Sequence, residues 1–260
     1  MYISFNKRKE RNSKKEAIGH LLVRSFAIYG IGAFLSLLVT LFLGVEGISF
    51  NILQGIGIAI ILAIPFLTVS TWLKAIVGLV MGIGEHFLLI LVEGPEYQFA
   101  DAGTVGVIGW SALLLFGLVM GDMFFKYRKK AGLWPYALAS IGFFVLGIVV
   151  SIWIPIVHLN ATLSYNMITI GVNSFIFLLL FLVSEKIWKK PGFLCSWGSS
   201  PIIVYVVHFV LWLIISVFSV NKTWFSDISL TLFIPLIIVY FGIIQSIVML
   251  LQKNNRIIKI

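Results

Sequence analysis

Long apolar runs dominate this chain and limit what it can fold into. Each run has about 20 residues, the length that an α-helix needs to cross roughly 30 Å of hydrocarbon. The runs lack the alternation of polar and apolar residues that is typical of outer-membrane barrel strands. We predict about eight spans, at residues 21–43, 50–69, 73–92, 104–125, 134–154, 163–184, 198–220 and 228–252.

The composition agrees with a chain that uses lipid as its solvent. Of its 260 residues, 60% are apolar and 11% are charged, whereas soluble proteins carry about 25% charged residues. The expected fold class is therefore all-α, a polytopic membrane helix bundle. The single cysteine, Cys195, excludes a disulfide framework. With four histidines and no HExxH or CxxC spacing, we expect no metal site.

The net charge of +9 is distributed unevenly about the predicted spans. Of the 19 basic residues, 18 fall on one side, and Lys222 is the exception. This bias predicts that both termini face the cytoplasm of a prokaryotic cell, with the protein in its plasma membrane. The one-sided distribution of basic residues argues against nucleic acid as a partner. Membrane lipid is the expected partner. We divide the chain into a basic tail at 1–20, a membrane domain at 21–252 and a second basic tail at 253–260.

Ionisable side chains inside a span are costly and therefore indicate function. Glu85 and His86 lie in the third span, and consecutive helix positions differ by about 100°, so their side chains point in different directions. His208 lies in the seventh span, one turn after Tyr205, where a Tyr–His pair facing the bundle interior is plausible. Each of these groups could equally form a structural hydrogen bond between helices.

Amides and basic residues complete the set of polar groups. Gln54 opens the second span among glycines that allow close helix approach, and Asn166 and Asn173 are seven residues apart on one helix face. Asp122 is expected to be a solvated acid at a helix end. The basic cluster that begins at Lys126 suits either lipid headgroups or a polyphosphate such as coenzyme A.

Several motifs occur in the order found in one family of membrane enzymes. Residues 22–66 include Arg24, which we expect to open a glycine-rich helix, and ISFNILQGIG at 48–57. The pair GW at 109–110, TLSY at 162–165 and the segment 197–208 that ends in a histidine follow in this order. This series resembles the transmembrane acyltransferases related to heparan-alpha-glucosaminide N-acetyltransferase. The resemblance extends from about residue 20 to residue 220.

The resemblance implies a bundle that moves an acyl group, typically acetyl, from cytoplasmic acyl-coenzyme A to a sugar or cell-envelope glycan across the membrane. A histidine would act as the base or as a transient acyl carrier. The resemblance, together with the position of the polar residues inside the spans, indicates three sets of candidate site residues. They are His208, Gln54, Glu85 and His86 for catalysis; Tyr205, Asn166, Tyr165 and Asn173 for substrate binding; and Lys126, Arg128 and Arg24 for the coenzyme A donor.

The chain also departs from the family pattern. Relatives usually begin with a helix that carries asp-x-x-arg-gly and a catalytic histidine, and we expect that helix to be missing here. Two other functions therefore stay open. One is a small secondary transporter or flippase in which Glu85 and His86 form a proton path, and the other is a noncatalytic membrane subunit. The sequence also leaves open whether the bundle forms a homo-oligomer.

Overall fold

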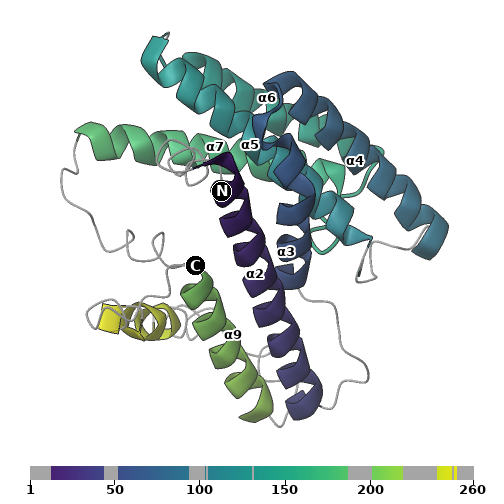
Figure 1. Ribbon diagram of the computed structural model, residues 1–260, viewed down its shortest axis with the longest axis vertical. Coiled ribbons are helices and arrows are strands. Elements are labelled where there is room, and N and C mark those ends of the chain that lie inside the picture. The colour runs from purple at the N-terminus through teal and green to yellow at the C-terminus, as the bar shows by residue number, and fades with distance from the viewer. Residues whose placement is uncertain are drawn as a thin grey trace. The chain divides into compact units, whose positions relative to one another are not determined.

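The computed structural model describes residues 13–43, 52–93, 103, 105–130, 132–186, 201–218, 239–247 and 249–250, and every regular element in these ranges is helical. The all-α prediction is confirmed for this part of the chain. The elements, labelled as in Figure 1, are α2 (Lys14–Leu43), α3 (Ile52–Ala63), the short 3₁₀ helix η1 (Ile64–Thr68), α4 (Thr71–Glu93), α5 (Gly106–Lys130), α6 (Trp134–Val150), α7 (Leu163–Lys186) and α9 (Pro201–Phe218).

Within the described ranges, four helices are long and apolar enough to cross a membrane: α2, α4, α5 and α7. The segments Ile52–Thr68 and Trp134–Val150 are shorter apolar helices. The protein is therefore an integral membrane protein, while the count of eight spans stays a prediction. The eighth predicted span, 228–252, lies largely outside the described residues.

The first helix begins earlier than the apolar run that predicted it. α2 starts at Lys14, where the Ser13 hydroxyl accepts a hydrogen bond from the backbone N–H of Glu16 at 3.3 Å. This is the arrangement of a helix N-cap, and Lys and Glu are good helix formers, so charged residues extend the helix beyond the apolar segment. Arg24 consequently lies ten residues inside α2, and our assumption that it opens the helix was wrong.

The chain forms two compact units, which we describe separately. The first contains residues 1–34 and 49–185, and therefore most of α2 together with α3 to α7. The second contains residues 35–48 and 186–260, which include the end of α2, helix α9 and the helical residues 239–247.

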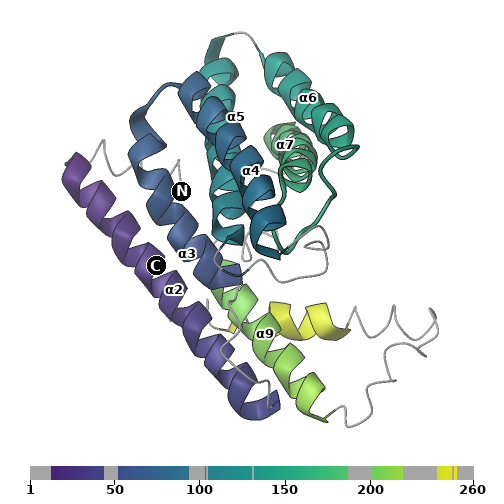
Figure 2. The same ribbon diagram turned by 90° about the vertical axis from the view of Figure 1, so that its right-hand side faces the viewer.

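Helix α5 lies at the centre of the first unit. Figure 2 shows α3, α4, α6 and α7 around it. The start of α7 also meets α4, where a Cβ atom on Gly82 would lie 2.7 Å from Cδ1 of Leu163. Three apolar clusters connect α5 with its neighbours. Their buried members are Ala17, Leu21, Ala63, Leu67, Leu115 and Leu118; Ala112, Phe116, Ile154, Leu163 and Met167; and Met120, Phe124, Tyr136 and Leu178. Because every cluster includes residues of α5, this helix is the one against which the site is built.

Helices α6 and α7 approach closely because small residues separate them. A Cβ atom on Gly171 would lie 2.5 Å from the backbone nitrogen of Phe144, and one on Gly147 would lie 2.7 Å from that of Ile168. Real Cβ atoms do not come so near to backbone atoms. Membrane helices commonly pack through such small residues. In lipid the hydrophobic effect does not drive helices together, so they associate through van der Waals contacts that a close approach of their backbones allows.

Candidate functional site

Two of the predicted donor-binding residues lie near the C-terminal end of α5. Lys126 and Arg128 are exposed there. The guanidinium carbon of Arg128 lies 4.8 Å from the ring centroid of Phe181 and 6.0 Å from that of Phe124, a cation–π arrangement that holds the side chain near the helix surface. We call this end of α5 the basic end and the opposite end the far end. The charge bias predicts that the basic end faces the cytoplasm.

A buried ion pair connects α4 and α5 near the basic end. The Lys74 ammonium nitrogen lies 2.6 Å from Oδ2 of Asp122, and the side chains are 2% and 13% exposed. The hydroxyl of Thr71 donates a hydrogen bond to the same oxygen at 3.1 Å. Our expectation that Asp122 is a solvated acid was therefore wrong. Lys74 is buried in the first turn of α4, and its ammonium group needs a counter-ion there.

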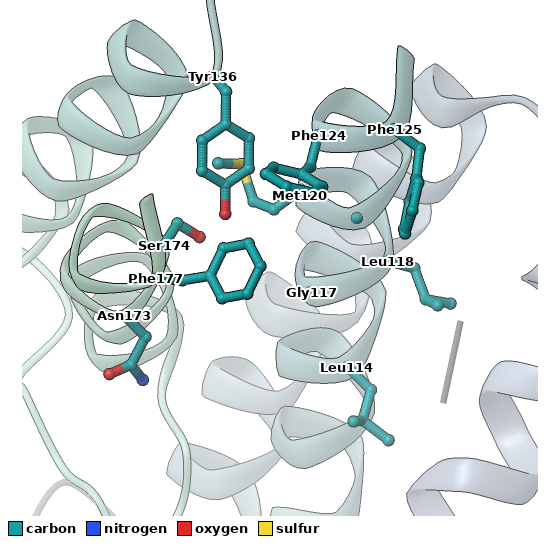
Figure 3. A pocket seen from close by; sticks show the side chains of 11 residues that line it. Leu114, Gly117, Leu118, Met120, Phe124, Phe125, Tyr136, Asn173, Ser174 and Phe177 are labelled. Carbon is teal, nitrogen blue, oxygen red and sulfur yellow. The ribbon is translucent and has the colours of Figure 1, made fainter. Parts of the chain in front are cut away.

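A pocket of about 410 Å³ opens between α5, α6 and α7 (Figure 3). Its walls are mainly aliphatic and aromatic, and the polar exceptions are Tyr136, Ser174 and Asn173. The hydroxyl of Tyr136 hydrogen-bonds the side chain of Ser174. Residues of α5 from Leu114 to Phe125 form one wall.

The pocket exists because α5 lacks side chains at two positions. Gly117 and Gly121 line it, and a Cβ atom on Gly117 would have only Ile170 Cδ1 within 4 Å, at 3.9 Å. Of the predicted site residues, Asn173 alone belongs to the lining. Sequence reasoning missed the pocket, although two glycines four residues apart on an otherwise bulky helix gave a signal for an open groove.

Glu85 and Asn166 are both fully buried, on α4 and α7. The amide nitrogen of Asn166 donates a hydrogen bond to the backbone carbonyl of Gly109 at 2.8 Å. No group in the described part of the chain is a hydrogen-bond partner for the amide oxygen of Asn166 or for either carboxyl oxygen of Glu85. Among the described residues, these three buried oxygens thus have no donor.

The antiparallel register of α4 and α5 fixes the level of Glu85. The Cβ position of Gly78 lies 3.0 Å from the ring of Phe116, and eleven residues further along α4, Leu89 packs against Val105, which precedes Phe116 by eleven. Glu85 follows Gly78 by seven residues and therefore lies level with the residue seven before Phe116, which is Gly109. Glu85 and Asn166 are thus at the same level of α5, near the far end.

A short loop covers α5 at that level. A Cβ atom on Gly109 would lie 2.5 Å from the carbonyl oxygen of Asn160 and 2.6 Å from that of Ala161, so only glycine allows this approach. Ala161 has a φ of 53°, an unusual conformation for a residue with a side chain. The hydroxyls of Thr162 and Ser164 donate to the carbonyl of Pro155, at 2.8 and 3.0 Å, and hold the loop in place.

Other predicted residues of the first unit lie elsewhere. Gln54 is 5% exposed at the contact of α2 and α3, where a Cβ atom on Gly32 would come within 2.8 Å of its backbone nitrogen. Arg24 is half-buried on α2, and its Nε has no partner among the residues that the structure describes. His86 and Tyr165 are half-buried, whereas Glu85 is fully buried. That the side chains of Glu85 and His86 point in different directions stays a prediction.

The predicted histidine of the seventh span belongs to the second unit. His208 on α9 is exposed, and its Nδ1 lies 2.6 Å from the hydroxyl of Tyr240. Tyr205 stacks on Phe209 with ring centroids 6.3 Å apart. The expected pairing of Tyr205 with His208, and any meeting of His208 with Glu85, stay predictions.

Comparison with protein families gives one match. The model described as heparan-alpha-glucosaminide N-acetyltransferase, catalytic, matches residues 1–149, which is more than half of the chain and extends from the N-terminus almost to the end of α6. A comparison with curated proteins found no match. The motifs at 162–165 and 197–208 lie outside the matched residues. The chain belongs to the heparan-alpha-glucosaminide N-acetyltransferase family, as the resemblance of its sequence motifs predicted.

Proposed function

We propose that this protein transfers an acyl group, most simply acetyl, from acyl-coenzyme A at the basic end of α5 to a sugar or cell-envelope glycan on the opposite side of the membrane. Its membership of an N-acetyltransferase family supports the reaction class. The observation that carries the proposal is the order of groups along α5. Exposed cations come first, the pocket follows, and a buried polar centre lies beyond it.

The basic end suits the phosphates of coenzyme A. Arg128 and Lys126 offer charged donors, and an arginine guanidinium matches the geometry of phosphate oxygens. The ring contacts of Arg128 reduce the freedom that it would lose on binding. We include Arg24 as a further contact for the donor, since its Nε is a buried donor with no partner in the described ranges.

The pocket provides a path for the arm that carries the thioester. Its α5 wall runs from Phe125 to Leu114, which is eleven helical steps or about 16 Å at 1.5 Å per residue. A volume of about 410 Å³ lies within the range of sites for small molecules. Tyr136, Ser174 and Asn173 supply hydrogen-bonding groups for the amides of such an arm (Figure 3).

Transfer itself is assigned to the far end of α5. Gly109, which marks the level of Glu85 and Asn166, lies five residues or about 8 Å beyond Leu114. We place the meeting of thioester and acceptor there, with Tyr165 of α7 near the acceptor. His208 and Gln54 remain proposed catalytic residues because they match positions of the family pattern. His86 on α4 is a further proposed catalytic residue, and Tyr205 on α9 is a proposed substrate-binding residue.

The test is transfer of labelled acetyl from acetyl-coenzyme A to glucosamine-type acceptors in membranes that contain the full chain. Gly117→Leu fills the pocket without a backbone clash and should raise the Kd for coenzyme A at least tenfold. Gly142→Leu is the matched control, because a Cβ atom there has nothing within 4 Å and Gly142 does not line the pocket. Absence of both transfer and coenzyme A binding in the wild-type protein would refute the proposal.

A proton-coupled transporter is the second candidate, and the buried carboxyl of Glu85 on a membrane helix is the observation that favours it. It predicts substrate uptake that depends on a pH gradient and is abolished by Glu85→Gln. Uptake of this kind without acetyl transfer would favour the transporter over the transferase.

A further inference from the structure

We propose that Glu85 removes the proton from the attacking group of the acceptor and that the amide oxygen of Asn166 binds the same group. This inference rests on the proposed acyl transfer and assigns a catalytic role within it. Nothing in the family match by itself assigns that role to either residue.

The first argument is the cost of the buried carboxyl group. Glu85 has 0% exposure, and both of its oxygens lack partners within the described residues. Burying a polar group without a hydrogen bond destabilises the folded protein, and burying a charge does so more strongly. A carboxyl group that destabilises the ligand-free protein in this way indicates a functional role in the protein with substrate bound.

The second argument is the position of Asn166. It comes from a different helix, α7, and the register places both residues at the level of Gly109. The 2.8 Å hydrogen bond from its amide nitrogen to the Gly109 carbonyl fixes the amide, so that its oxygen is held in one direction. This oxygen also has no donor among the groups that the structure describes.

The third argument is chemical. The carboxylate oxygens of Glu85 and the amide oxygen of Asn166 find no donor among the described residues, and the amine or hydroxyl of an acceptor would bring N–H or O–H donors to them. Two of these oxygens belong to a carboxyl group, which can also take a proton. A bound sugar amine would therefore be oriented by Asn166 and deprotonated by Glu85.

The step balances with the groups named. The acceptor nitrogen or oxygen forms a bond to the thioester carbonyl carbon while its proton passes to a carboxylate oxygen of Glu85. The carbon–sulfur bond then breaks, and the sulfur leaves with the electron pair as the coenzyme A thiolate. Glu85 returns the proton to that sulfur, so the enzyme ends in its starting state. Because the carboxyl group is fully buried in the structure, the acceptor reaches it only when the residues that cover it move apart.

The experiment compares Glu85→Gln and Glu85→Asp in the full chain, with Glu16→Gln as the matched control because Glu16 is an exposed acid of α2. Loss of a general base lowers the rate by about 10²–10⁴-fold. We expect Glu85→Gln to lose kcat by this factor while the Kd for coenzyme A changes less than twofold. Glu85→Asp retains a carboxyl group and should keep more activity than Glu85→Gln.

A second substrate separates catalysis from structure. Hydroxylamine attacks thioesters without help from a base, and it also does so in free solution, so the quantity measured is the protein-dependent rate above that background. Glu85→Gln should keep this protein-dependent rate near the wild-type value. We expect Asn166→Ala to raise the KM for a sugar acceptor at least tenfold and to leave the hydroxylamine reaction unchanged.

Three results would overturn the assignment. Wild-type kcat in Glu85→Gln would show that the carboxyl group takes no proton. Equal loss of both reactions together with coenzyme A binding would show that Glu85 has a structural role only. A wild-type protein that transfers acetyl to neither substrate would instead overturn the proposed function, and this role with it.

Discussion

Removal of Asp122 should destabilise the protein strongly, because it leaves the ammonium group of Lys74 buried without its counter-ion. Lys74 is 2% exposed and lies 2.6 Å from Asp122. It is also in the first turn of α4, where the helix dipole disfavours a positive charge. Breaking a buried pair by removing one partner costs about 3–5 kcal/mol. We therefore expect Asp122→Ala to lower the free energy of unfolding by about this amount.

A double-mutant cycle tests the cause of this loss. Lys74→Met combined with Asp122→Leu removes both charges, and replacing a buried pair by apolar residues is often neutral or stabilising. We expect the double variant to lie within about 1 kcal/mol of the wild-type free energy of unfolding, although each single variant is less stable. Lys126→Met, which removes an exposed cation of α5, is the control and should change stability by less than about 0.5 kcal/mol.

Reversible unfolding in mixed detergent micelles, followed by circular dichroism, would supply these free energies. The reasoning fails if Asp122→Ala costs less than about 1 kcal/mol, because a buried ammonium group would then tolerate the loss of its partner. It fails equally if the double variant is as unstable as Asp122→Ala, because the charges would then not be the cause.

Two further predictions concern packing near the site. Gly171→Ala should lower the free energy of unfolding by about 1–3 kcal/mol, because its Cβ would lie 2.5 Å from the backbone nitrogen of Phe144. Gly142→Ala is the control and should be neutral or up to about 1 kcal/mol stabilising, because nothing lies within 4 Å of its Cβ position. Thermal unfolding of the two variants compares them. Asn166→Leu should cost about 1–3 kcal/mol in the same assay, because the buried carbonyl of Gly109 would lose its 2.8 Å hydrogen bond, and an unchanged midpoint would contradict this.

The sequence alone determined the solvent and the class of this protein. Apolar runs of about 20 residues require helices, because in lipid each backbone group must find its partner within its own segment. The same patterns identified Glu85 and Asn166 as notable, since charged and amide groups are rare in such helices. The family was also predictable, because its motifs are local in sequence.

Tertiary structure decided which polar groups meet. No sequence pattern paired Lys74 with Asp122, since 48 residues separate them and the antiparallel register of α4 and α5 brings them together. The pocket beside Gly117 likewise depends on what α6 and α7 place opposite an absent side chain. Helical periodicity gives the direction of a side chain about its own axis, but the register between helices follows from packing, which joins residues far apart in the chain.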